Sequence, residues 1–365
     1  MKIGIDSSRA FVKNRTGIEE YSYQVVKHLR EELSDCNVIL YLRRDQSIDF
    51  DLPKKWEIRR INFSRFWTQL GLSFEMFRRP IDVLFVPSHT VPFIHPKDTI
   101  VTIHGLEYEI MPEAYSFWER MYMRFSIKKS CRWAKKIISV SRNTKEDLMR
   151  LYGVPEEKIY IVYEGVSLET RSTQQSTKFL PSRKHKPYLL FVGRIEKRKN
   201  IEGIIEAYRI LVEKYNISHK LVLAGRPGYG YESIKYKVEN SKHKEGIIET
   251  GYVSEEEKYS LLKNAAVFLF PTFYEGFGLP ILEAQSLGTP VVASNVSSLP
   301  EVGGNSVAYA TPEEPVSISE SVKEILSNEE FRDDLIKKGF ENVKRFSWEK
   351  CANSISKLLM DKLEI

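Results

Sequence analysis

The feature that most constrains the fold is an alternation of short apolar runs with helical patterns. In the first half, the runs rich in β-branched residues are KIGID, NVILYL, DVLFVP, TIVTIH and KIISVS, and a helical pattern, EEYSYQVVKHLREEL, follows the first of them. In the second half the runs are PYLLFVG, HKLVLAG, GIIETG, AVFLFP, TPVVAS and SVAYAT. Continuous apolar strands separated by helices are typical of parallel sheets covered on both faces. The sequence therefore predicts an α/β fold.

A polar segment divides the chain into two halves. Residues 166–186, VSLETRSTQQSTKFLPSRKHK, are rich in Ser and Thr and have no hydrophobic period, so we interpret them as a linker. We expect an N-terminal domain over 1–165 and a C-terminal domain over 187–345, each with its own doubly wound, Rossmann-like sheet. Residues 346–365 predict an amphipathic C-terminal helix that can pack back on the N-terminal domain. Because ligands of such sheets bind beyond the carboxyl ends of the strands, we expect the two domains to face a cleft.

Composition limits the compartment and the partners. The three cysteines, Cys36, Cys131 and Cys351, are far apart and odd in number, which argues against a disulfide framework and for a reducing compartment. The chain opens with a strand-like run, and no apolar run approaches the roughly 20 residues of a membrane-spanning helix. We therefore expect a cytoplasmic protein, either soluble or peripheral on the inner face of the membrane. No His or Cys cluster predicts a metal site, and we expect no cofactor and no nucleic-acid partner.

The net charge of +6 is unevenly distributed. Residues 1–165 hold 27 Lys and Arg against 22 Asp and Glu, and residues 166–186 hold five against one, whereas residues 187–365 hold 23 against 26. This basic excess indicates either an anionic partner on the N-terminal side or simply a slightly basic protein.

Two aromatic and basic segments have two interpretations each. In the segment 117–136, basic residues four apart form a winding stripe on a predicted helix, and they are Arg120, Arg124, Lys128, Arg132 and Lys136. The stripe is either a solvated face or a surface for anionic lipid or a lipid-diphosphate acceptor, while Phe117, Met121 and Phe125 can face a core. In the segment 65–79, RFWTQLGLSFEMFRR, aromatic residues favour the core over a membrane contact.

The stretch PTFYEGFGLPILEAQSLGTPVV, at 271–292, combines two carboxylates with a glycine turn. Pro271 ends a buried strand, and a loop leads to a helix that starts at Leu279-Pro280, a position where proline fits. Gly276 and Gly278 therefore lie before a helix N-terminus, whose free N–H groups and dipole favour phosphate. Glu283, one turn into the helix, could accept hydrogen bonds from a ribose diol, and Glu275 could hold another hydroxyl group.

A second turn, in PYLLFVGRIEKRKN, adds cations at another strand end. Gly193-Arg194 directly follows the strand, and Lys199 precedes Asn200, a plausible cap for the helix IEGIIEAYRIL. An Arg and a Lys near the carboxyl end of a parallel strand suit a diphosphate. For Lys197 and Arg198 a solvated basic turn is an alternative interpretation.

Together these segments resemble glycosyltransferase family 4, the retaining enzymes of the GT-B fold. GRIEKRKN resembles the family's basic phosphate segment, and PTFYEGFGLPILEAQSLGTPVVASNVSSLPEV is similar to its Glu-x7-Glu motif. GYVSEEEKYSLLKNAAVFLFP also fits, with Ser254 and Glu257 as a capping box. Family-like segments in the first half are GIDSSRAFVKNRTGIEEYS, VTIHGLEYEIMPEAY, IISVSRNTKEDL and IVYEGV. The resemblance covers nearly the whole chain.

The resemblance implies a role for each matching position. Arg194 and Lys199 would neutralise the donor diphosphate, beside Gly193. The backbone amides of Gly276, Phe277, Gly278 and Leu279 would hold the outer phosphate. Glu283 would bind the ribose, Glu275 the transferred sugar, and the backbone near Tyr252 and Val253 the base. His104 would meet the donor sugar from the other domain, and Gly17 would let donor or acceptor approach closely.

The chain departs from the family pattern on the acceptor side. It has His104-Gly105 where relatives often have His-Asp, and Gly17-Ile18-Glu19-Glu20 where they often have Gly-Ile-Gly-Arg. As a whole, the resemblance implies a metal-independent hexosyltransferase that acts in surface polysaccharide or glycolipid assembly. Its donor would be GDP-mannose or a UDP-sugar, and its acceptor a carbohydrate or a lipid-linked molecule. A nucleotide-sugar epimerase of similar architecture and a non-catalytic nucleotide-sugar-binding subunit remain as alternatives.

Overall fold

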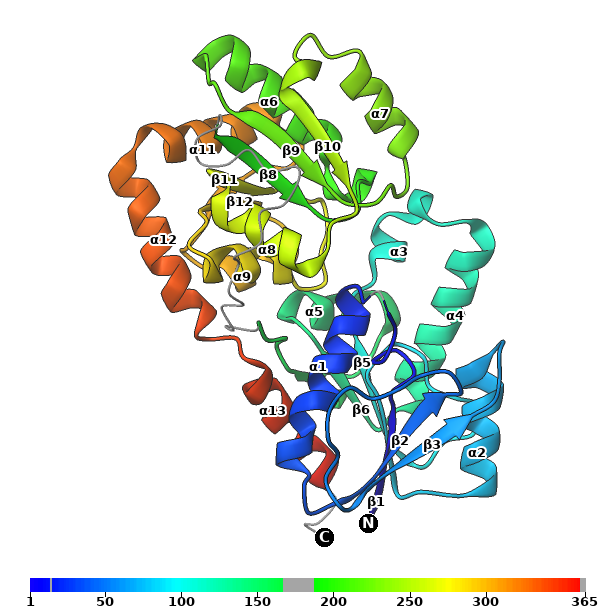
Figure 1. The fold of residues 1–365 in the computed structure, drawn as a ribbon. Coiled ribbons are helices and arrows are strands. Elements are labelled where there is room, and N and C mark those ends of the chain that lie inside the picture. Colours follow the sequence, from blue (N-terminus) through cyan, green and yellow to red (C-terminus); the bar gives the residue numbers. More distant parts are fainter. Residues whose placement is uncertain (14, 167–186, 362–365) are drawn as a thin grey trace. The chain divides into compact units, whose positions relative to one another are not determined.

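The computed structural model describes residues 1–13, 15–166 and 187–361. The predicted linker therefore lies outside the described residues, except for Val166. The chain divides into two compact units (Figure 1). Unit 1 contains Met1–Glu109, Tyr115–Gly165 and Phe346–Ile365, and unit 2 contains Ile110–Ala114 and Val166–Arg345.

Unit 1 is built on a parallel seven-stranded sheet in the order β3-β2-β1-β4-β5-β6-β7. Its strands are β1 Lys2–Asp6, β2 Asn37–Arg43, β3 Trp56–Ile61, β4 Val83–Val86, β5 Asp98–Ile103, β6 Lys136–Ser139 and β7 Ile159–Ile161. The five strands predicted in this half are confirmed. The two additional strands, β3 and β7, form the two edges of the sheet, and both carry exposed side chains, so neither has the fully apolar pattern of a central strand.

Helices cover the sheet of unit 1: α1 Gly17–Glu32, α2 Ser73–Arg78, α3 Glu107–Ile110, α4 Phe117–Trp133, α5 Arg142–Tyr152 and α13 Trp348–Met360. Alternate side chains of the central strands, such as Ile39 and Leu84, share one core with residues of α2, α4 and α5. α13 packs against α1, where the rings of Tyr21 and Trp348 lie 6.1 Å apart. A Cβ on Gly165 would lie 2.2 Å from the Trp348 nitrogen, so this approach of the chain to α13 requires glycine.

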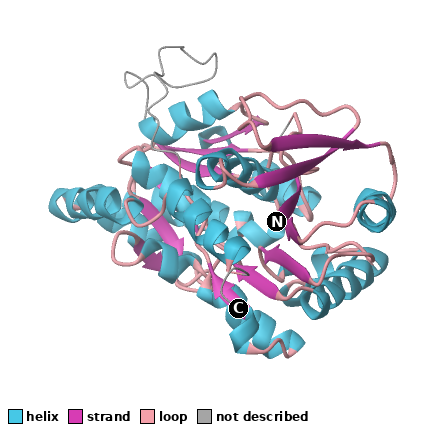
Figure 2. Cartoon of the chain, turned by 90° about the horizontal axis from the view of Figure 1, so that it is seen from below, coloured by secondary structure: helices cyan, strands magenta, loops and turns pink. Residues whose placement is uncertain are grey.

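Unit 2 is built on a parallel six-stranded sheet in the order β10-β9-β8-β11-β12-β13. Its strands are β8 Tyr188–Val192, β9 Lys220–Ala224, β10 Ile247–Gly251, β11 Val267–Phe270, β12 Val291–Ser294 and β13 Ala308–Ala310, and all six were predicted. Its helices are α6 Ile201–Tyr215, α7 Tyr231–Glu239, α8 Glu255–Asn264, α9 Leu279–Ser286, α10 Leu299–Gly303, α11 Pro315–Ser327 and α12 Glu329–Val343. Figure 2 shows helices flanking the strands, as a doubly wound sheet requires.

The strand order of unit 2 places two loops side by side. From β8 the chain moves outward to β9 and β10, and then returns to place β11 on the other side of β8. The loops that follow β8 and β11 therefore leave the carboxyl ends of adjacent parallel strands at the point where the order reverses. This is the position at which open α/β sheets bind ligands.

No helix in the described ranges combines the length and the apolar character that crossing a bilayer requires.

Candidate functional site

The first loop of the site follows β8. Gly193 has φ +151°, a backbone conformation that favours glycine, and its N–H donates to the Ala224 carbonyl at 2.9 Å. Asn200 occupies the N-cap position of α6, as predicted, but its side chain makes no capping hydrogen bond. Instead, the Asn200 amide donates to the carbonyls of Pro271, at 3.0 Å, and Pro312, at 2.6 Å. The cap prediction was therefore wrong about the side chain, which ties this loop to the one after β11.

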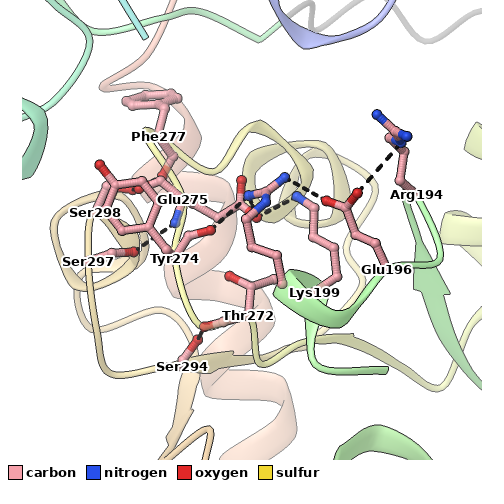
Figure 3. A network of polar contacts seen from close by, with 11 residues as sticks. Arg194, Glu196, Lys199, Thr272, Tyr274, Glu275, Phe277, Ser294, Ser297 and Ser298 are labelled. Atoms are coloured by element: carbon pink, nitrogen blue, oxygen red, sulfur yellow. Dashed lines mark hydrogen bonds and ion pairs between the residues drawn. The ribbon is translucent and has the colours of Figure 1, made fainter. Parts of the chain in front are cut away.

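The second loop follows β11 and ends at the N-terminus of α9. Gly278 has φ +127°, and a Cβ there would lie 2.8 Å from the Leu299 side chain, so this turn requires glycine. Two serines on the segment before α10 support the loop (Figure 3). The Ser297 Oγ accepts from the Glu275 N–H at 3.1 Å, and the Ser298 Oγ lies 2.5 Å from the Phe277 carbonyl. The loop backbone beside the helix N-terminus is thus fixed by side chains from another segment.

A cluster of charges joins the two loops. The Lys199 ammonium and the Arg198 guanidinium both donate to Oε1 of Glu275, the latter at 3.2 Å. Arg198 also donates to the Tyr274 carbonyl at 2.8 Å and to Glu196 at 2.9 Å. Only 12% of the Glu275 side chain is exposed. Burial alone would raise the pKa of Glu275, but Lys199 and Arg198 outweigh burial and hold this pKa below its usual value.

The three cationic side chains Arg194, Lys197 and Arg198 differ in exposure. The Arg194 side chain is 66% exposed, and its Nε lies 3.6 Å from the Glu196 carboxylate (Figure 3). Lys197 is exposed as well, whereas only 17% of the Arg198 side chain is exposed. The interpretation of Lys197 and Arg198 as one solvated turn was therefore wrong for Arg198. The short 3-10 turn at Lys197–Lys199 directs these neighbouring side chains to different sides.

Glu283 belongs to a separate ion pair. On α9 it accepts from the Lys258 ammonium at 2.8 Å, and Lys258 comes from α8. Burial would lower the pKa of Lys258, but the carboxylates of Glu283 and Glu255 outweigh it and raise this pKa. The predicted Ser254–Glu257 capping box at the start of α8 is confirmed. Lys258 was not among the predicted site residues.

The loops after β9 and β10 adjoin the first loop. The Ile195 N–H donates to the Arg226 carbonyl at 2.9 Å, and the Gly225 N–H donates to the Gly251 carbonyl at 2.8 Å. The Arg226 guanidinium lies 4.2 Å from the centre of the Tyr252 ring, which is largely exposed. Val253 packs against the core of unit 2. The loops that carry Arg194 and Tyr252 are therefore connected through the loop after β9.

In unit 1, His104 directly follows β5 and is nearly buried. Its Nε2 lies 2.8 Å from the Pro87 carbonyl, and its Nδ1 lies 3.2 Å from the Glu164 carboxylate. Gly17 is the first residue of α1, and apart from its chain neighbours and its own helix backbone, no atom of the described residues lies within 4 Å of where its Cβ would be. The roles of His104 and Gly17 toward a donor or acceptor stay predictions.

Comparison with known proteins places these features in a family. The model described as Glycosyltransferase Family 4 matches residues 15–170, and the model Glycosyl transferases group 1 matches residues 172–342. O-antigen chain mannosyltransferase B of Escherichia coli is 34% identical over 256 residues, which are 69% of this chain and 67% of the relative. O-antigen chain mannosyltransferase RfbU of Salmonella typhimurium is 28% identical over 65% of this chain and 63% of its own length. Parts of these relatives therefore lie beyond the matched region.

Solved structures show the same architecture. Sucrose-phosphate synthase of Thermosynechococcus elongatus matches with a TM-score of 0.75 at 19% identity over 99% of both chains. Anabaena HepE in complex with UDP-glucose matches with a TM-score of 0.74 at 15% identity, over 99% of this chain and all of that one. The two parallel, doubly wound sheets define an α/β protein of the GT-B fold class. Within that class, the chain belongs to glycosyltransferase family 4.

Proposed function

We propose that this chain is a retaining, metal-independent mannosyltransferase that uses GDP-mannose as donor and acts in polysaccharide assembly. The observation that carries the proposal is the charged cluster at the reversal point of the unit 2 sheet, where Lys199 and Glu275 meet beside the N-terminus of α9. The named mannosyltransferases among the relatives support mannose as the sugar. The carbohydrate or lipid-linked acceptor belongs to the same proposal.

We assign the diphosphate, the sugar and the ribose of the donor to residues of this site. The exposed Arg194 and the ammonium of Lys199 supply positive charge for the diphosphate, and the amides from Gly276 to Leu279 supply donors for its outer phosphate. Glu275 uses Oε1 for its two cationic partners, so Oε2 is the oxygen that we expect a sugar hydroxyl to reach. Glu283 is expected to bind the ribose diol, with Lys258 holding its carboxylate in place.

The proposed chemistry depends on stabilising the leaving group. The bond between the anomeric carbon and the outer phosphate breaks, and the acceptor oxygen bonds to that carbon on the same face. The acceptor proton passes to the departing phosphate. Arg194, Lys199 and the amides before α9 stabilise the charge that develops on that phosphate, and preorganised charges of this kind are a large source of catalysis. These fixed cations would replace a divalent metal ion.

A thermal-shift measurement tests the donor assignment. GDP-mannose and GDP are expected to raise the melting temperature, because a ligand at 100 times its Kd stabilises the folded state by about 2.7 kcal/mol. GMP should produce a smaller shift, since it lacks the outer phosphate. Lys197→Ala, a charge change on the same turn but outside the cluster, should respond like the wild type. A shift with UDP-sugars alone would refute the GDP-mannose assignment, and no shift with any nucleotide-sugar would refute the donor site.

A further inference from the structure

Unit 1 exposes a concentration of large apolar side chains. Of the 21 exposed large hydrophobic residues in the described chain, twelve belong to unit 1 between Phe63 and Phe125. Phe117, Met121 and Phe125, which the helical spacing indicated can face a core, are 68%, 44% and 53% exposed. The interpretation as core residues was therefore wrong for these three side chains. Large exposed apolar areas on soluble proteins commonly mark interaction surfaces.

The exposed face of α4 has an apolar half and a cationic half. At about 100° per residue, one 140° face carries Phe117, Trp118, Met121, Tyr122 and Phe125 in the first turns. The same face continues with Lys128, Lys129 and Arg132 toward the C-terminus of the helix. The buried residues of α4 lie on the opposite side, and they are Ser126, Ile127, Ser130 and Cys131. The aromatic face is therefore a solvent-facing surface rather than part of the core.

Among the described residues, Lys128, Lys129 and Arg132 form no ion pair with a carboxylate. Arg124, just beyond the edge of the face, and Arg120, on the buried side of the helix, both pair with Glu109. Lys129 instead lies 5.6 Å from the centre of the Phe125 ring and Lys128 lies 4.8 Å from that of Tyr152. Residues 117–136 hold seven Lys and Arg and one Glu. The surface thus joins aromatic side chains to a strong local positive charge.

A second apolar segment is connected to α4. On α2, Phe74 and Phe77 are 59% and 70% exposed, and Arg78 and Arg79 follow them. The loop after β4 bridges the two helices, because the Ile94 N–H donates to Ser73 Oγ at 3.2 Å and the Val91 N–H donates to Ser130 Oγ at 2.9 Å. This loop exposes Phe93 and Ile94. We call the combined surface, made of α2, residues 90–94 and α4, the aromatic-basic face.

We propose that the aromatic-basic face docks on an anionic lipid bilayer. The exposed aromatic residues of α2 and α4 would enter the headgroup region, and Lys128, Lys129 and Arg132 would contact lipid phosphates. Aromatic side chains favour this interface, and each Lys or Arg near an anionic surface adds attraction. The charge favours lipid over a second copy of this chain, since a second copy would bring the same cations. This inference is independent of the proposed function.

Tryptophan fluorescence provides a direct test, because Trp118 is 79% exposed whereas Trp56, Trp67 and Trp348 are at most 7% exposed. The fifth tryptophan, Trp133, is half-buried, and its ring centre lies 6.0 Å from that of Phe93. Adding vesicles of phosphatidylcholine with phosphatidylglycerol should shift the emission to shorter wavelength and sediment the protein. Vesicles of phosphatidylcholine alone should bind at least about tenfold more weakly. Trp118→Phe should abolish most of the shift while retaining sedimentation.

Variants separate the two halves of the face. Phe77→Ser with Trp118→Ser, and separately Lys128→Ala with Lys129→Ala and Arg132→Ala, should each weaken sedimentation with anionic vesicles at least about tenfold. Tyr236→Ser, a similar change at a 69% exposed residue of unit 2, should bind like the wild type. Undiminished binding by both variants, or no binding by the wild type, would overturn the proposal. A Trp118 shift that depends on protein concentration without vesicles would instead show self-association and overturn it too.

Discussion

Replacing Arg194 with alanine is expected to lower turnover by at least about 100-fold, as removal of one preorganised donor to a developing oxyanion does in other enzymes. Folding should persist, because the Arg194 side chain is 66% exposed and its contact in unit 2 is a 3.6 Å approach to Glu196. Steady-state release of nucleoside diphosphate measures the first expectation, and thermal unfolding measures the second.

Lys197→Ala is the matched control for Arg194→Ala. It removes one positive charge from the same loop, three residues away, at an exposed position. We expect its turnover to stay close to that of the wild type. A folded Arg194→Ala variant with near-normal turnover, or equal losses in both variants, would show that Arg194 has no specific part in stabilising the diphosphate.

Glu283→Gln and Glu275→Gln are expected to affect different steps. Charged hydrogen bonds contribute about 1.5–3 kcal/mol, so losing the ribose acceptor in Glu283→Gln should weaken binding of free GDP by roughly tenfold or more. Glu275→Gln should leave GDP affinity nearly unchanged, because free GDP carries no sugar. It should instead lower turnover, where positioning of the sugar matters most. Calorimetric titration with GDP and steady-state kinetics measure the two effects.

The pair between Glu283 and Lys258 calls for an additional variant. Glu283→Gln leaves the buried ammonium of Lys258 with less compensation, which could itself disturb α9. If that disturbance caused the lost affinity, adding Lys258→Met to Glu283→Gln should restore it. If Glu283 binds the ribose, the double variant should bind GDP as weakly as Glu283→Gln. Equal affinity losses in Glu275→Gln and Glu283→Gln would contradict the division of roles.

The fold was predictable wherever burial left a continuous apolar pattern. All six strands of unit 2 and five of the seven strands in unit 1 have such runs, because parallel strands are covered on both faces. The edge strand β3, WEIRRI, places three charged residues among its apolar ones, and β7 has only three residues, so neither contains a continuous apolar run. The aromatic residues of α4 have the helical spacing that normally indicates a face packed on the core, but in the structure this face is exposed.

The site was predictable in its motifs but not in its pairings. Pro280 lies in the first turn of α9 and Gly278 precedes it, and local turn chemistry is sufficient to place both. The pairing of Lys258 with Glu283 joins residues 25 positions apart on two helices, and no local pattern specifies it. Arg198 and Lys197 are adjacent cations, and only the folded turn shows that Arg198 enters the cluster with Glu275.

Transfer from radiolabelled GDP-mannose to a panel of alkyl glycosides, in excess EDTA, tests the central claim most directly. We predict that labelled glycoside and GDP form in equal amounts, and that the new linkage keeps the anomeric configuration of the donor. Conversion to another sugar nucleotide without release of GDP would indicate an epimerase. Loss of transfer in EDTA that Mg²⁺ or Mn²⁺ restores, or absence of transfer from GDP-mannose, would contradict the account.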